Sequence, residues 1–255
     1  MQELAGKTVV VTGASKGIGA AIAAAVGAAG AHVVAHWGHD RRGAEAATAD
    51  VPAERVKLLQ ADFAEPANAD AFWAEAEGWR GRVDVLVNNA AVLRLRGGID
   101  DTAEAWDEVW DEALRVNTLA PARLMRAAVR SWLGQGGGSL VTISSWVTYR
   151  GVANPAGIAY AASKAAMAAA TKTVARAYAK EGVLAYCVSP GVVRTQMSVD
   201  SAATLGGEQA VTAGLAMGEW VPPSDIAELV VFLAAGRCRH LTGATIDVNG
   251  ASYLR

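Results

Sequence analysis

The feature that most constrains the fold is a regular alternation of short apolar runs with longer segments of helical character. Most of the runs are continuous stretches of Val, Leu and Ile, which is typical of parallel strands buried on both faces. Strands with one face in water would instead alternate polar and apolar residues. The expected strands cover residues 8–12, 32–37, 56–61, 83–88, 140–144, 184–189 and 244–248.

The segments between these runs repeat a strand–helix unit along the chain. This repetition predicts a parallel sheet covered by helices. Right-handed crossovers then give a doubly wound, Rossmann-type α/β fold of about seven strands. Asp101 and Glu104 form a capping pattern that predicts the start of the longest helix. The expected helices cover residues 17–29, 42–49, 68–79, 102–132, 158–180 and 224–235.

No proline-rich or charged linker divides the chain. Residues 134–139 form a glycine-rich loop that is too short to separate domains, and residues 195–221 show only weak periodicity with several glycines. Chains of this length with an α/β pattern often fold as one unit. We therefore expect residues 1–255 to form a single domain.

Composition argues against several classes of protein. The chain carries a formal net charge of −2 and no basic block, so nucleic acid is not an expected partner. Cys187 and Cys238 lack a second ligand at metal-binding spacing, which predicts free thiols in a reducing, cytoplasmic compartment and no metal site. Residues 17–39 lack Asp, Glu, Lys and Arg, but glycines and two histidines interrupt them, so we expect no membrane span.

Glycines cluster directly after the first expected strand, in the sequence TGASKGIG at residues 12–19. Glycines let the backbone turn tightly and approach a pyrophosphate closely, and the N–H groups that begin a helix favour phosphates. A purely structural turn is the alternative, but the strand–turn–helix context is the one that a dinucleotide site requires. The turn residues expected to contact the cofactor are Gly13, Ser15, Lys16, Gly17, Ile18 and Gly19.

The end of the second expected strand bears on which dinucleotide binds. Rossmann folds that bind NAD place a carboxylate there, against the ribose 2′-hydroxyl. Here the strand ends at Trp37, an expected cofactor contact, and Asp40 follows only in the turn. Lys16, Arg41 and Arg42 offer cations to a 2′-phosphate, so NADP(H) is favoured over NAD(H). The alternative is that the two arginines are simply a solvated helix start.

Tyr160 and Lys164 lie four residues apart near the start of an expected helix, which places them on one face. A phenol has a pKa near 10, so proton exchange near neutral pH requires a shift of roughly 3 units, or about 4 kcal/mol. A neighbouring ammonium group supplies part of such a shift. The same spacing also fits two ordinary surface neighbours, so the pair gains meaning only from its context.

Polar residues upstream supply that context. The fifth expected strand ends at Ser144 and Ser145, where doubly wound folds place their sites. A hydroxyl there can hydrogen-bond a substrate oxygen as charge develops on it. Asn117 lies inside the longest expected helix, where Asn is mildly unfavourable. It could bind a water molecule, mark a helix irregularity or make a hydrogen bond in the core.

Together these residues resemble the Asn-Ser-Tyr-Lys tetrad of the classical short-chain dehydrogenase/reductase family. The order of motifs along nearly the whole chain carries the resemblance: TGASKGIG, then NNA at residues 88–90, YAASK at residues 160–164 and SPG at residues 189–191. The resemblance implies an NAD(P)-dependent oxidoreductase that transfers a hydride between a nicotinamide cofactor and a carbonyl or secondary alcohol. It implies Tyr160 as general acid/base, Lys164 lowering its pKa and binding ribose, Ser145 polarising the carbonyl and Asn117 supporting a proton-relay water.

The same resemblance extends the expected cofactor contacts beyond the glycine turn. Asp62 matches the residue that contacts the adenine, and Thr195 matches the one that contacts the nicotinamide carboxamide. The family also implies a homotetramer, formed through residues 102–132 and 158–180 and the C-terminal segment. Further cofactor contacts expected on this pattern are Phe63, Asn89, Tyr160, Lys164, Pro190, Gly191 and Val193.

Two positions depart from the family pattern. Ala91 stands where the family usually has Gly, and it is strained if that position requires a positive φ or a close approach. Ser145 precedes Tyr160 by slightly more residues than in the family. Ser145 is therefore preferred over Ser144 as the catalytic serine while Ser144 stays an alternative.

The substrate itself is not specified by the sequence. Residues 146–158 and a candidate lid, residues 195–220, are expected to line its pocket. Sugars, polyols, short oxoacyl esters, steroids and small ketones all remain open. Candidate apolar walls are Trp146, Met197 and Met217, and candidate anion ligands are Arg94, Arg96, Arg150 and Arg194, of which Arg94 and Arg96 are expected to face solvent.

Two other functions are weighed against hydride transfer. A non-catalytic NADP-sensing regulator would have no need for Tyr160 or Lys164. A lyase or epimerase that uses transient oxidation is typical of longer relatives, and the short C-terminal region and the three-residue glycine spacing argue against it.

Overall fold

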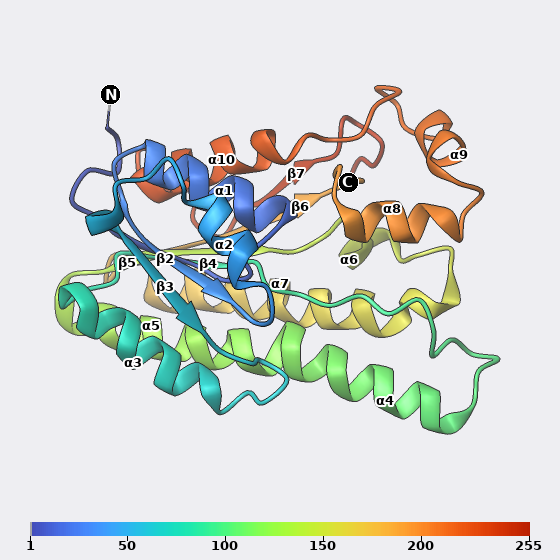
Figure 1. The fold of residues 1–255 in the computed structure, drawn as a ribbon, viewed down its shortest axis with the longest axis horizontal. Coiled ribbons are helices and arrows are strands. Elements are labelled where there is room, and N and C mark those ends of the chain that lie inside the picture. Colours follow the sequence, from blue (N-terminus) through green and yellow to red (C-terminus); the bar gives the residue numbers. More distant parts are fainter. Residues whose placement is uncertain (1) are drawn as a thin grey trace.

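The computed structural model describes residues 2–255 and contains one seven-stranded, fully parallel sheet in the order β3-β2-β1-β4-β5-β6-β7 (Figure 1). The order reverses direction at β1, as in a doubly wound fold. The expected Rossmann-type architecture is thereby confirmed. The strands are β1 (Thr8–Val11), β2 (His32–Trp37), β3 (Val56–Gln60), β4 (Val85–Asn88), β5 (Gly138–Ile143), β6 (Val183–Pro190) and β7 (Thr245–Val248).

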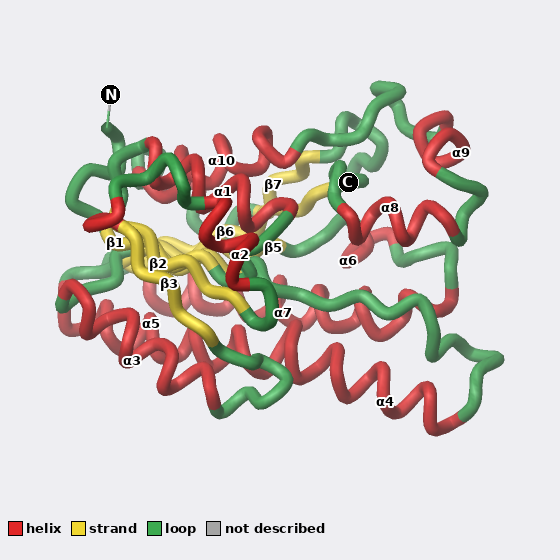
Figure 2. Tube along the Cα trace, viewed as in Figure 1, coloured by secondary structure: helices red, strands yellow, loops and turns green. Residues whose placement is uncertain are grey.

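Helices cover both faces of the sheet, which is why its strands are apolar throughout (Figure 2). Side chains alternate between the two faces, so Val9 and Val11 join one core cluster and Val10 joins the other. One face is covered by α1 (Gly17–Ala28), α2 (Arg41–Ala47) and α10 (Pro223–Ala235), and the other by α3 (Asn68–Arg80), α4 (Ala103–Leu114), α5 (Ala120–Gln135) and α7 (Ile158–Tyr178).

The longest expected helix differs from the structure in two respects. It is broken by a π-helical turn, Arg115–Leu119, between α4 and α5. The expected capping pattern is wrong, because Thr102 caps α4 by accepting from the Ala105 N–H, while Asp101 accepts from the Gly98 N–H. A hydroxyl one residue later than expected therefore satisfies the first turn.

Three short helices lie in the segments after β5 and β6, beyond the carboxyl edge of the sheet (Figure 1). Weak periodicity in this part of the sequence did not reveal them. They are α6 (Val147–Arg150), α8 (Gln196–Ala203) and α9 (Glu208–Ala213). Among residues 2–255, no helix has both the length and the apolar character needed to cross a membrane.

Candidate active site

The glycine turn leaves β1 in a conformation that side chains would prevent. Gly13 and Gly17 have φ of 66° and 57°, in the left-handed region. A Cβ atom at Gly19 would lie 2.0 Å from the carbonyl oxygen of Gly13. Lys16, the residue before α1, makes no side-chain cap, and the first turn of α1 contains no acidic residue. This geometry fits a pyrophosphate, because the first backbone N–H groups of α1 lack a capping side chain.

Two polar side chains hold this turn against β4. The Asn89 amide donates to the carbonyl oxygens of Thr12 and Gly13, at 2.8 and 3.2 Å. The Thr12 hydroxyl accepts from the N–H groups of Asn89 and Ala90, at 2.9 and 3.0 Å. Thr12 was not singled out from the sequence, although it directly precedes the first glycine. Asn89 therefore fixes the shape of the glycine turn by binding the backbone carbonyl groups of Thr12 and Gly13.

Strain at Ala91 is not found. Ala251, with φ of 57°, is the only non-glycine residue of positive φ within residues 2–255. The positive φ that would strain Ala91 is therefore absent, because this backbone needs no left-handed residue there.

His36 also supports the glycine turn, and the sequence reasoning missed it. Its Nδ1 accepts from the Gly13 N–H at 2.9 Å, so Nε2 carries the proton and donates to the Ala61 carbonyl at 2.9 Å. The ring stacks on Phe63 with centroids 4.2 Å apart. Burial lowers the pKa of His36 to about 4, so the ring is neutral at pH 7. A histidine inside a buried strand was the available signal.

The expected phosphate-binding cations lie beside the glycine turn. Lys16, Arg41 and Arg42 are exposed. Arg41 forms an ion pair with Glu45 at 2.8 Å. Asp40 caps α2 by accepting from the Gly43 N–H, and its carbonyl accepts from the Ser15 hydroxyl at 2.6 Å.

The remaining expected cofactor contacts lie on α1 and near the ends of β2, β3 and β6. Asp62 is exposed at the end of β3, while Phe63 is buried against His36. Thr195 lies against the glycine turn, since a Cβ atom at Gly17 would lie 2.9 Å from the methyl group of Thr195. The other residues of these segments are Trp37, which is half-buried at the end of β2, Ile18, which packs against the core, Pro190, which ends β6, and Gly191 and Val193, which follow it.

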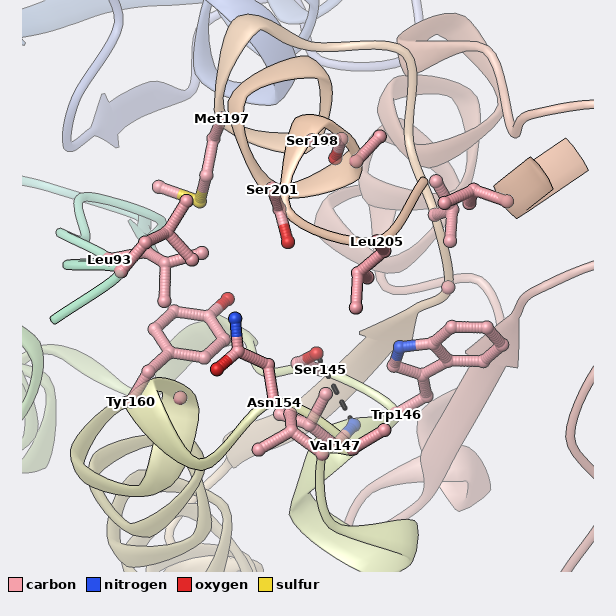
Figure 3. A pocket seen from close by; sticks show the side chains of 18 of the residues that line it. Leu93, Ser145, Trp146, Val147, Asn154, Tyr160, Met197, Ser198, Ser201 and Leu205 are labelled. Carbon is pink, nitrogen blue, oxygen red and sulfur yellow. Dashed lines mark hydrogen bonds between the residues drawn. The ribbon is translucent and has the colours of Figure 1, made fainter. Parts of the chain in front are cut away.

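The expected catalytic serine and tyrosine line one cavity (Figure 3). Tyr160 projects from the first turn of α7, and Ser145 follows β5. Burial raises the pKa of Tyr160 to about 12, against a smaller opposing effect of a hydrogen bond with the Ser145 side chain. Ser144 points elsewhere, with its hydroxyl 2.9 Å from that of Thr148. The geometry thus favours Ser145 over Ser144.

Lys164 is buried one helical turn after Tyr160, as the spacing predicts. Its Nζ donates to the Ile143 carbonyl at 2.8 Å and lies 5.8 Å from the centre of the Tyr160 ring. Burial lowers the pKa of Lys164 to about 8. At pH 7 the side chain is still predominantly an ammonium group, held beside the phenol.

Asn117 lies at a helix irregularity and also makes hydrogen bonds in the core, the two structural roles expected as alternatives to water binding. It lies in the π-helical turn, and it is buried. Its Oδ1 accepts from the Val92 N–H at 2.8 Å, and its Nδ2 donates to the Val92 carbonyl and the Ser163 hydroxyl. Asn117 therefore ties the segment after β4 to α7 below the cavity.

The cavity has a volume of about 210 Å³ and opens beyond the carboxyl edge of the sheet. The expected walls Trp146 and Met197 line it, but Met217 does not; its side chain packs against Gly250 instead. Figure 3 shows the hydroxyls of Tyr160 and Ser201 directed into the cavity from opposite sides. Most of the remaining lining is apolar and includes Leu93, Leu95, Val147, Val152, Val192, Leu205 and Val211.

The buried His36 predicts a pH dependence of stability. Its pKa falls from 6.5 in the unfolded chain to about 4 in the folded one. The stabilisation is therefore fully present above pH 6.5 and lost as the pH falls towards 4, by on the order of 3 kcal/mol. Urea unfolding at several pH values should show a shallower acid dependence for His36→Gln than for the wild type. The exposed His39→Gln variant is the control, and equal slopes for His36→Gln and wild type would contradict the assignment.

Comparisons with known proteins agree with this geometry. A family model described as enoyl-(acyl carrier protein) reductase matches residues 13–251. L-rhamnose 1-dehydrogenase (NAD(P)(+)) of Sphingomonas sp. strain SKA58 is 33% identical, covering 100% of this chain and 99% of its own. The 3-oxoacyl-[acyl-carrier-protein] reductase FabG of Escherichia coli K12 is 32% identical, covering 98% of both chains.

Solved structures give the same result. A candidate NAD(P)-dependent gluconate 5-dehydrogenase from Beutenbergia cavernae, with NADP bound at low occupancy, superposes with a TM-score of 0.88. It is 34% identical, and 98% of each chain is covered. A dehydrogenase/reductase from Sinorhizobium meliloti 1021 has a TM-score of 0.86 and 32% identity, over 99% of this chain and 97% of its own. The chain therefore belongs to the short-chain dehydrogenase/reductase family of NAD(P)-dependent oxidoreductases.

Proposed function

We propose that this protein interconverts a carbonyl compound and a secondary alcohol with NADP(H), using Tyr160 as the proton donor and acceptor. The observation that carries the proposal is that the hydroxyl-bearing side chains of Tyr160 and Ser145 line one cavity, with Lys164 buried behind them. This cavity and the glycine turn share the carboxyl edge of one sheet, so we also propose that residues 1–255 act as a single domain.

The glycine turn supplies the cofactor site in this proposal. Gly13, Gly17 and Gly19 leave room for a pyrophosphate, and the N–H groups that begin α1 donate to it. Thr195 lies between this turn and the cavity wall and is proposed to hold the nicotinamide end. A bound nicotinamide dinucleotide supplies or accepts the hydride.

The chain's own residues handle the proton. Ser145 donates a hydrogen bond to the substrate oxygen, where negative charge develops during reduction. The pKa of about 12 keeps Tyr160 protonated, so its phenol can deliver a proton to that oxygen. The Lys164 ammonium stabilises the phenolate that remains and is proposed to bind the ribose. Asn117 is proposed to support a relay water that returns a proton to this group.

Replacing Tyr160 with Phe removes the proton donor without changing the shape of the cavity. We expect kcat to fall at least about a hundredfold, because general acid catalysis is lost. The affinity for NADPH should stay nearly unchanged when it is measured by fluorescence titration. Tyr149→Phe, which removes a hydroxyl 3.2 Å from that of Thr245, is the matched control. Unchanged turnover in Tyr160→Phe would refute the role.

The substrate for these measurements comes from a panel followed by the absorbance of reduced nicotinamide. Names of the relatives include a sugar dehydrogenase, an aldonate dehydrogenase and an oxoacyl reductase, so the panel should contain all three chemistries with small ketones and steroids. Cofactor binding without an absorbance change on any compound would favour a sensor or a lyase over the proposed reaction.

The preference for NADP(H) over NAD(H) rests on the surroundings of β2. No carboxylate ends this strand, and Asp40 is engaged in capping α2. Lys16 and Arg42 are exposed cations beside the turn that leads to a 2′-phosphate position. The Beutenbergia cavernae neighbour with bound NADP supports the same assignment.

Kinetics with both cofactors test this preference. Wild-type enzyme should have a lower KM for NADPH than for NADH. Lys16→Ala and Arg42→Ala should each raise the KM for NADPH by about tenfold while leaving that for NADH nearly unchanged, since each removes a charged contact to phosphate. Arg176→Ala, an exposed position at the other end of the molecule on α7, should change neither. A wild-type preference for NADH would overturn the assignment.

A homotetramer and a cytoplasmic location are also proposed. Leu119 and Leu133 on the α4–α5 side are 50% and 45% exposed, and Leu254 near the C-terminus is 78% exposed. Large apolar side chains left exposed to solvent can mark a protein interface. The free thiols of Cys187 and Cys238 suit a reducing compartment.

Light scattering coupled to size exclusion tests the assembly. We expect four chains per particle, and Leu119→Glu should lower this number because it places a charge in the proposed interface. A wild-type particle that contains one chain would contradict the proposal.

A further inference from the structure

Among residues 2–255, Arg150 is the one charged residue in the wall of the substrate cavity. We propose that its guanidinium forms a carboxylate-binding subsite, so that the substrate is a carbonyl or alcohol compound that carries a carboxylate. This inference rests on the proposed hydride-transfer function and narrows its substrate class.

Ion pairing separates Arg150 from the other arginines that the sequence offered as anion ligands. Arg94 is held by Glu112 at 2.6 Å, and Arg96 by Glu108 at 2.7 Å. Arg194 pairs with Glu208 at 3.0 Å. Arg150 forms no ion pair with any acidic side chain of residues 2–255, and it alone of the four lines the cavity. Its charge is therefore available to a ligand.

The other residues that line the cavity are uncharged, so the charge of Arg150 determines which ligand charge the cavity favours. No Asp or Glu occurs among the lining residues, which are all within the described chain. Its polar groups are neutral, such as the hydroxyls of Ser145, Ser198 and Ser201. Arg150 is exposed, so water screens its charge, and the selection of an anion rests on the uncharged lining around it. An anionic substrate would meet no opposing carboxylate on entering.

The guanidinium is already held at the cavity wall. It lies over the Trp146 ring, 4.3 Å from the ring centre, and Trp146 itself lines the cavity. This cation–π contact holds the guanidinium at the ring face and gives its N–H donors no hydrogen-bond acceptor. The side chain of Arg150 makes no hydrogen bond within residues 2–255 that would use these donors. A planar fork of donors matches the two oxygens of a carboxylate.

The position of Arg150 also indicates where the carboxylate lies relative to the reacting carbon. Ser145, which is proposed to bind the substrate oxygen, directly precedes Trp146 and α6. Arg150 ends α6, four residues after Trp146, which corresponds to a rise of about 6 Å. Both groups therefore belong to one wall of the cavity, and a short carbon chain can join a carbonyl at Ser145 to a carboxylate at Arg150.

Matched pairs of compounds test the subsite. The probes are acetoacetate, levulinate and a six-carbon aldonate, the first two each paired with its methyl ester and the third with its primary amide. Binding to the enzyme loaded with NADPH or NADP is measured by calorimetry, and turnover by absorbance. We expect the wild type to bind the best acid about tenfold or more tightly than its neutral counterpart. Arg150→Gln should raise KM for that acid by the same factor, with kcat and the neutral compound little changed.

Two control variants separate charge from fold. Arg150→Lys keeps the charge without the planar fork and should retain part of the preference for the acid. Arg96→Gln removes an arginine whose charge is paired with Glu108 outside the cavity and should retain all of it.

The outcomes distinguish this inference from the function on which it rests. Equal handling of acids and neutral compounds by the wild type, or an acid preference that survives in Arg150→Gln, overturns the subsite and leaves hydride transfer intact. Acid binding that is lost in Arg150→Gln, together with no turnover of any compound in the wider panel, supports the subsite and refutes the reaction.

Discussion

The approach of the Gly13 carbonyl oxygen to Gly19 is the constraint on which the rest of the site depends. A Cβ at position 19 would lie 2.0 Å from that oxygen, so α1 can start this close to β1 only without a side chain. The chain then secures the turn from two sides: Asn89 binds its carbonyls from β4, and His36 accepts its Gly13 N–H from β2. These three strands are neighbours in the sheet, so their pairing brings together the residues that shape the proposed cofactor site.

The sequence was sufficient for the parts of the protein whose geometry follows from backbone rules. Continuous apolar runs located all seven strands, and spacing placed Tyr160 and Lys164 on one face of α7. The sequence was insufficient where a single hydrogen bond determines the local structure. Nothing local distinguishes Thr102 from Asp101 as a cap, and the partners of His36 are contributed by residues 13 and 61, far from it in the chain. The short helices near the cavity are also invisible to periodicity, since four to eight residues give too little pattern.

The pKa of Tyr160 determines how much free energy is needed to form the phenolate in the site. From sequence, the phenol needed a shift of roughly 3 units to react near neutral pH. Burial moves the pKa of Tyr160 to about 12, in the opposite direction, so forming the phenolate at pH 7 costs about 7 kcal/mol. The Lys164 ammonium donates to the Ile143 carbonyl and lies 5.8 Å from the centre of the phenol ring, while burial outweighs the opposing hydrogen bond with Ser145 in setting the pKa of Tyr160. The neutral phenol is thus the resting form, and in the proposed reaction the same group gives up its proton in reduction and takes one back in oxidation.

In the proposed function, cofactor and substrate are therefore handled by different kinds of structure at one edge of the sheet. The proposed cofactor site, the glycine turn, is made mainly of backbone. It consists of glycines without side chains, the N–H groups at the start of α1 and the carbonyl groups bound by Asn89. Substitution there is limited because almost any side chain would fill the space. The substrate cavity is made of side chains on α6 and α8, outside the sheet, where a residue can change without disturbing strand pairing. A single guanidinium in such a wall can select the charge of a substrate, and the short-chain fold beneath it stays the same.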